Sequence, residues 1–158
     1  MATMSIGAAI HWQAQQAPDA LCITHEGRSI TRAQLDRRSN RLARAYEQCG
    51  VKQDDMVTIA LPNGIEFYEA CIATWKLGAT PQPVSARLPV REREAIVELA
   101  DPPLVVGVEE GTHAGRTTVP AGFEPEAGLS EEPLPDPETW RSAHVRKSNC
   151  RSQMVPQP

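Results

Sequence analysis

Residues 56–84 constrain the fold of this chain more than any other stretch. The run 56–61 is almost wholly apolar and rich in β-formers, which is typical of a strand covered on both faces. The Pro-Asn-Gly sequence at 62–64 ends this run, and a helical period begins at Ile65. A second strand follows in 79–84. A strand, a crossover helix and a strand of these lengths form a βαβ unit, which is parallel and right-handed in nearly all known cases.

The predicted helix of this unit has one apolar face. Gly78 is placed to close it in a left-handed cap. We interpret the aromatic members of the face as core residues rather than a ligand box. The face consists of Phe67, Ala70, Cys71, Thr74 and Trp75.

The sequence before residue 56 predicts a short helix, a hairpin and a long helix. The short helix covers 6–16, with Ile6, Ala9, Ile10 and Ala14 facing inward. Strands at 21–24 and 28–30 are joined by a turn at Glu26-Gly27. The sequence Thr-Arg-Ala-Gln from Thr31 is a capping box that opens the long helix, and Gly50 ends it.

After the βαβ unit, Pro89 marks the first position of another amphipathic helix, whose charges alternate in sign and are expected to stay in water. Residues 104–108 then read as a third buried parallel strand. The predicted fold class is therefore α/β: a β-hairpin, then a β-α-β-α-β portion of a doubly wound parallel sheet, with a largely irregular C-terminal tail.

Charge divides the chain into three parts. Residues 1–108 carry a net charge of −1, residues 109–138 carry −7, and residues 139–158 carry +4. Nine of the 14 prolines lie beyond residue 101. We therefore predict an α/β subdomain at 1–108, an acidic Pro/Gly-rich loop segment at 109–145 and an unpatterned basic tail at 146–158. Asp136-Pro137-Glu138 could cap one short turn carrying Trp140.

Composition excludes several classes of protein. No apolar run reaches about 18 residues, so a membrane span is not expected. The first residues lack the basic start of a secretory signal. Three of the cysteines fall in apolar patterns typical of buried, reduced thiols, and we predict a cytoplasmic protein. The four are Cys22, Cys49, Cys71 and Cys150.

Four arginines on the long helix raise the possibility of nucleic-acid binding. They alternate with Asp36 and Glu47, and neither an aromatic platform nor a recognition motif accompanies them. We predict a solvated helix face and no nucleic-acid partner. The four are Arg37, Arg38, Arg41 and Arg44.

The sequence lacks the common short catalytic and nucleotide-binding motifs. The sequence contains no phosphate loop of the G-x-x-x-x-G-K-[ST] type, no G-x-G-x-x-G, no H-E-x-x-H, no C-x-x-C and no G-x-S-x-G. Residues 62–64 precede a helix N-terminus at a carboxyl strand end, where anions bind in open α/β sheets. The interpretation we favour is that Asn63 caps the helix and Gly64 eases the turn. We therefore assign no catalytic, cofactor-binding or metal-binding residue, and we interpret His25 as a turn residue.

Four sequence segments in series resemble the N-terminal region of AMP-forming acyl-CoA synthetases, the adenylate-forming ligases related to fatty-acid and bile-acid CoA ligases. The segments are GRSITRAQLDRRSNRLA at 27–43, GVKQDDMV at 50–57, LPNGIEF at 61–67 and WKLGATPQPV at 75–84. The resemblance covers about residues 8–108. Arg32 departs from it, because the family often carries an aromatic residue there.

The resemblance implies a two-step reaction in complete members. A carboxylate, such as a fatty acid, attacks the α-phosphate of ATP in the presence of magnesium to give an acyl-adenylate, and coenzyme A then displaces AMP. The family's phosphate loop is rich in Ser, Thr and Gly and ends in Lys-Gly, and no position here matches it. We therefore expect an inactive fragment that binds none of these cofactors, whose reading frame is shifted or truncated near residue 146, and which self-associates through uncovered apolar surface. The alternative is a small non-enzymatic α/β binding module with a disordered charged tail.

Overall fold

The computed structural model describes residues 4–137. Its helices and strands are, in chain order, α1 (Ile6–Gln16), β1 (Leu21–His25), β2 (Arg28–Thr31), α2 (Arg32–Gln48), β3 (Met56–Ile59), α3 (Ile65–Lys76), β4 (Thr80–Pro83), α4 (Val90–Ala100), β5 (Leu104–Val106) and β6 (Thr117–Val119). The α/β class is confirmed. The predicted turn carrying Trp140 and the basic tail lie outside the described residues.

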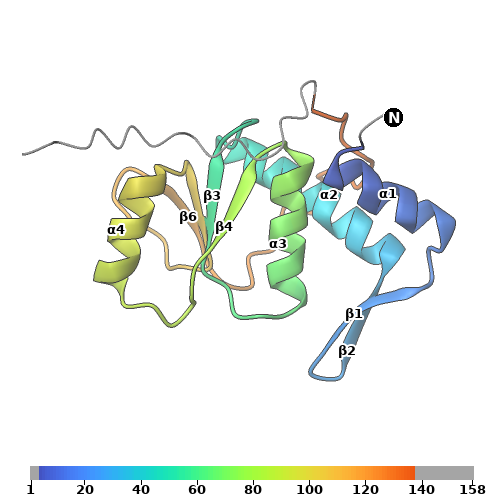
Figure 1. Ribbon diagram of the computed structural model, residues 1–158, viewed down its shortest axis with the longest axis horizontal. Helices are drawn as coiled ribbons and strands as arrows, with labels where there is room; N and C mark the ends of the chain where they lie inside the picture. Colours follow the sequence, from blue (N-terminus) through green and yellow to red (C-terminus); the bar gives the residue numbers. More distant parts are fainter. Residues whose placement is uncertain (1–3, 138–158) are drawn as a thin grey trace, which may run out of the picture.

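A four-stranded sheet forms the centre of the molecule, in the order β4-β3-β5-β6, and every neighbouring pair is parallel. Figure 1 shows α4 on one side of this sheet and α3 on the other, with α1 and α2 beyond α3 and the β1–β2 hairpin projecting away. This is the doubly wound arrangement that the sequence predicts for β3-α3-β4-α4-β5.

The core follows the two-residue period of the strands. Val57, Ile59, Leu104 and Val106 pack in a cluster with side chains of α2 and α3. Ala60 and Val105, which point the other way, pack with Val97 of α4. The sheet is therefore covered on both faces, and this is why its strands are apolar runs rather than alternating ones.

Local signals place the ends of the elements well. Thr31 and Gln34 form the predicted capping box at the start of α2. Glu26 and Gly27 both have positive φ in the hairpin turn, as a tight β-hairpin requires. Gly78 follows α3 at φ +71°, which confirms its predicted role in ending that helix.

Strand β6 is absent from the sequence prediction, which treats this stretch as loop. Thr117–Val119 is too short and too polar to show a strand pattern, yet it pairs with all of β5. Gly107 makes the turn after β5 possible: its φ is +87°, and a Cβ there would lie 2.6 Å from the carbonyl oxygen of Ala60. The sheet therefore extends into the acidic segment.

Three smaller expectations are wrong. Ile6 is exposed, and Gly7 takes the inward place because α1 packs closely on Lys76 of α3. Cys22 is also exposed, at an irregularity in the hairpin register, whereas Cys71 is buried as expected. Pro89 is the N-cap of α4 rather than its first residue.

The charges of α4 do not all stay in water. Arg93 is buried, and its Nε donates to Nε2 of His113 at 3.1 Å. Desolvation in this buried setting lowers the pKa of His113, and the nearby Arg93 charge lowers it further. The neutral imidazole thus joins α4 to the loop between β5 and β6.

Replacing Ile59 with alanine removes a side chain that is fully buried between the sheet and α3. We expect this change to lower the free energy of unfolding by about 2–5 kcal/mol, because the cavity it leaves cannot fully collapse. Urea denaturation measures the loss. The matched control is Leu99→Ala on α4, where the side chain is 82% exposed and a change within about 0.5 kcal/mol is expected.

The Arg93–His113 contact predicts a pH-dependent part of the stability. Because the folded pKa of His113 lies below its ordinary value of about 6.5, the unfolded chain binds more protons in that range, and stability falls as pH drops below about 6.5. His113→Gln should lose less stability than the wild type between pH 7 and pH 5. Equal losses in the two proteins, measured by urea denaturation at each pH, would contradict the assignment.

Candidate functional site

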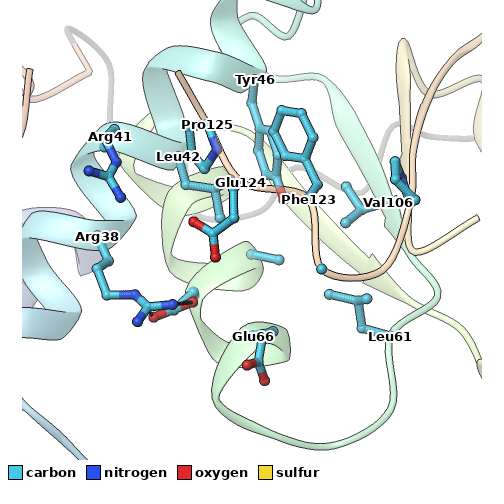
Figure 2. A pocket seen from close by; sticks show the side chains of 14 residues that line it. Arg38, Arg41, Leu42, Tyr46, Leu61, Glu66, Val106, Phe123, Glu124 and Pro125 are labelled. Atoms are coloured by element: carbon cyan, nitrogen blue, oxygen red, sulfur yellow. Dashed lines mark hydrogen bonds and ion pairs between the residues drawn. The ribbon is translucent and has the colours of Figure 1, made fainter. Parts of the chain in front are cut away.

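The strongest candidate site is a cavity at the carboxyl edge of the sheet, where ligands bind in open α/β folds. Leu61 and Val106 line it from the ends of β3 and β5, and the segment after β6 closes it opposite α2 and α3. Figure 2 shows Arg38 and Glu124 pointing into the cavity from these two sides. Its volume is about 90 Å³.

One ion pair spans the inner wall of this cavity. Arg38 Nε of α2 lies 2.6 Å from Oε1 of Glu69 on α3, and Arg38 also donates to Glu69 Oε2 at 3.2 Å. The Glu69 side chain is only 7% exposed. Burial raises its pKa, while the adjacent Arg38 charge opposes the rise. The pair therefore joins α2 to α3 at a partly desolvated position.

A second pair lies nearer to solvent. Arg28 of the hairpin donates to Glu66 Oε1 at 2.7 Å. The pKa of Glu66 is lowered, first by a hydrogen bond from its own backbone N–H and then by the Arg28 contact. Glu66 thus supplies negative charge to the first turn of α3, where the free N–H groups of a helix attract anions.

This arrangement bears on the predicted roles of residues 62–64. Gly64 is the N-cap of α3, and no side chain caps the helix; the prediction that Asn63 does so is wrong. Asn63 is exposed and Gly64 is buried. Since Glu66 already supplies a negative charge beside the N-terminus of α3, the anion-binding interpretation has less support than the sequence suggested.

The rest of the cavity wall is apolar. Leu42 and Tyr46 of α2 belong to the main core cluster, and Phe123 packs against that cluster from the segment after β6. Burial raises the pKa of Tyr46, so its hydroxyl stays neutral. The carboxyl-edge cavity is therefore a small space above the core, with an apolar wall and one ion pair.

The volume of the carboxyl-edge cavity limits the size of the molecule that it can hold. A volume of about 90 Å³ matches roughly three water molecules at about 30 Å³ each. Pockets for small organic ligands are commonly about 300–1,000 Å³. The carboxyl-edge cavity therefore does not enclose a nucleotide. Within residues 4–137, moreover, no group of three or more His, Cys, Asp and Glu side chains could hold a metal ion.

A second polar cluster lies where α1, α2 and α3 meet. The Lys76 ammonium of α3 contacts Asp36 Oδ1 and Asn40 Oδ1 of α2, each at 2.6 Å, and also donates to the Asp36 carbonyl oxygen. His11 Nδ1 of α1 lies 2.8 Å from Asp36 Oδ2. Burial lowers the pKa of Lys76, and the Asp36 contact opposes this. A cavity of about 240 Å³ adjoins the cluster, between α1 and residues 133–136.

Neither the Arg38–Glu69 pair nor the Lys76 cluster was predicted from the sequence, although the pattern of α2 carries a signal for the Lys76 cluster. Asp36, Ser39 and Asn40 share the helix face that carries Leu35 and Ala43, and all five are buried. Polar side chains at positions i, i+3 and i+4 on an apolar face require buried partners. The partner Lys76 lies 40 residues away in the sequence, so only the fold identifies it.

The arginine face of α2 also differs from its prediction. Arg37 and Arg41 contact the Glu131 carboxylate, and Arg44 donates to the Glu132 carbonyl oxygen at 2.8 Å. With Arg38 paired to Glu69, all four arginines have partners within the protein. Arg37 is exposed and the other three are half-buried, so the face is solvated only in part, and the prediction missed its partners within the protein. His25 is exposed at the hairpin end, as expected.

Comparison with known proteins agrees with the architecture. The family model described as AMP-binding enzyme matches residues 10–155, nearly the whole chain and beyond residue 146. The chain belongs to the AMP-binding enzyme family. In the part of the chain that the structure describes, no helix is long and apolar enough to cross a membrane.

Curated relatives of the chain include a CoA ligase and a peptide synthase. A 3-oxocholest-4-en-26-oate–CoA ligase from Rhodococcus rhodochrous is 37% identical over 84 residues, 53% of this chain and 15% of the ligase. A dimodular nonribosomal peptide synthase from Bacillus subtilis is 28% identical over 141 residues, 89% of this chain and 6% of the synthase. The chain thus spans a small part of the length of either relative.

Solved structures of family members share the fold. O-succinylbenzoate coenzyme A synthetase from Bacillus subtilis, in complex with AMP, has a TM-score of 0.67 at 21% identity over 78% of this chain and 34% of that one. NpsA from Klebsiella oxytoca has a TM-score of 0.68 at 20% identity over 77% of this chain and 25% of that one. At these identities the likeness concerns the fold alone.

Replacing Lys76 with methionine tests the buried cluster. Asp36 would then be left buried without its cation, and we expect a loss of about 3–5 kcal/mol in the free energy of unfolding. Urea denaturation measures it, with the exposed Lys52→Met as the matched control. The double variant Lys76→Met, Asp36→Leu should be more stable than Lys76→Met alone. A loss below about 1 kcal/mol in the single variant would contradict this role.

Proposed function

We propose that this chain is the N-terminal scaffold of an adenylate-forming ligase that activates a carboxylic acid. The observation that carries the proposal is the family match over residues 10–155. It is supported by the parallel sheet whose carboxyl edge, at Leu61 and Val106, faces the candidate cavity. In this family role the chain supplies a rigid edge against which the nucleotide-binding parts of a complete enzyme are built.

The acceptor we propose for the complete enzyme is coenzyme A, and the acid is fatty-acid-like. The 3-oxocholest-4-en-26-oate–CoA ligase, at 37% identity, supports this choice, as do the four sequence segments that resemble acyl-CoA synthetases. A second candidate is an adenylation unit of a peptide synthetase. The peptide synthase relative favours it, because that match covers 89% of the chain.

We propose that ATP and magnesium are not held by the carboxyl-edge cavity of this chain. The carboxyl-edge cavity holds about 90 Å³, and its Arg38 and Glu69 already pair with each other. No step of the reaction is therefore assigned to side chains of residues 4–137. We propose instead that the 158-residue chain alone is inactive, and that its contribution is to hold the sheet, α2 and α3 in a fixed arrangement.

The proposal predicts that the purified chain shows no carboxylate-dependent exchange of pyrophosphate into ATP and forms no acyl-CoA. The measurement uses a panel of fatty acids, sterol acids and amino acids, with a complete acyl-CoA ligase as the positive control. Exchange clearly above the acid-free background would contradict the inactivity. Amino-acid-dependent exchange would in addition favour the peptide-synthetase candidate.

The coding DNA gives an independent test of the family role. The family match runs in the present frame to residue 155, and we expect the coding DNA downstream of it to encode, in one of the three frames, a loop rich in Ser, Thr and Gly that ends in Lys-Gly. If no frame encodes such a loop, the binding-module alternative replaces the ligase proposal. The predicted self-association stays a prediction, and sedimentation of the purified chain measures it.

A further inference from the structure

The acidic segment after β6 lies across three separate cavities. We call residues 120–137 the acidic strap: it contains five acidic residues, five prolines and no Lys, Arg or His. Its residues 120–125 wall the carboxyl-edge cavity, and residues 133–136 wall the cavity beside Lys76. Glu131 lines a third, more open cavity of about 420 Å³ between the hairpin and α2.

Side chains of α2, which bind both the Glu131 carboxylate and backbone carbonyl oxygens of the strap, attach it to the fold. Among the described residues, no backbone-to-backbone hydrogen bond joins 121–137 to a helix or strand. The Glu131 carboxylate lies 3.2 Å from Arg41 and 3.7 Å from Arg37. Asn40 Nδ2 donates to the Glu131 carbonyl oxygen at 2.8 Å. The attachment is therefore concentrated on one turn of the strap and one face of α2.

Other contacts hold the strap on both sides of this point. Phe123 and Leu134 are partly buried against the main core cluster. Ser5, the N-cap of α1, donates its hydroxyl to Asp136, and Pro137 packs against Gly78 at the end of α3. Two apolar side chains anchor a segment that has no regular secondary structure, which is typical of parts that open locally.

We propose that the acidic strap is a lid latched by charge, which opens as a unit while the sheet and helices stay folded. Exposed ion pairs are weakened when salt shortens the range of electrostatic attraction, from about 10 Å at 0.1 M to about 3 Å at 1 M. Apolar contacts such as those of Phe123 are not weakened in this way. Opening uncovers the walls of all three cavities, so the accessible volume of the candidate site depends on the latch. This inference does not rest on the proposed ligase activity.

A glutamate-specific protease tests the latch, because the carboxylate it must recognise at the Glu131–Glu132 bond is the one held by Arg37 and Arg41. In the full 158-residue chain, we expect cleavage there to accelerate roughly three- to tenfold between 0.05 and 1 M NaCl, the size expected for two exposed ion pairs. Rates are normalised to a free peptide of the strap sequence, which removes the effect of salt on the protease. Cleavage after Glu98 in α4 reports global unfolding and should not change.

The double variant Arg37→Gln, Arg41→Gln should give the same acceleration at low salt, since it leaves the cleavage site intact and removes both partners of the carboxylate. The matched control is Arg91→Gln, an exposed arginine on α4, for which the rate should equal that of the wild type. The proposal is overturned if salt and the double variant leave cleavage at Glu131 unchanged. It is equally overturned if cleavage after Glu98 rises in parallel, because the strap would then open only when the whole domain unfolds.

Discussion

The buried contact of Lys76 with Asp36 and Asn40 is the interaction on which the arrangement of the helices depends. A buried ammonium without a partner is costly, so α3 can pack on α2 only in the register that brings these groups together. His11 extends the same cluster to α1. Three helices distant in sequence are thereby held in one relative position on one face of the sheet.

The other face of the sheet depends more on apolar contacts. Val105 and Ala60 meet Val97 of α4 through apolar contacts, and one buried hydrogen bond, from Arg93 to His113, joins α4 to the loop between β5 and β6. Apolar burial is strong but non-directional, and it fixes proximity better than register. The polar contacts of the α1–α2–α3 side therefore carry most of the geometric definition, and the candidate cavity lies on that side beside Arg38 and Glu69.

Opposite charges in distant segments organise the outer surface. The arginines of α2 and the acids of residues 120–137 are separate, unbalanced blocks in the sequence, and in the fold they face each other. Ion pairs and the strap also explain why the carboxyl-edge cavity is small. Its walls come from elements joined by ion pairs, and its outer side is closed by the strap, which encloses room for a few waters but not for a nucleotide.

The hairpin, the capping box at Thr31 and the β3-α3-β4-α4-β5 order are predictable from sequence, because periodicity, caps and turn residues act over a few neighbouring positions. The family is predictable from four segments that resemble it. The roles of β6, Lys76, Arg93 and the arginines of α2 become visible only in the packed fold. Strand β6 is defined by its neighbour β5, since three residues carry no period of their own. The charged residues looked solvated because their partners lie about 20 to 95 positions away. Neighbouring residues determine where helices and strands form. Which charged side chains pair with each other is determined by the packing of the whole fold.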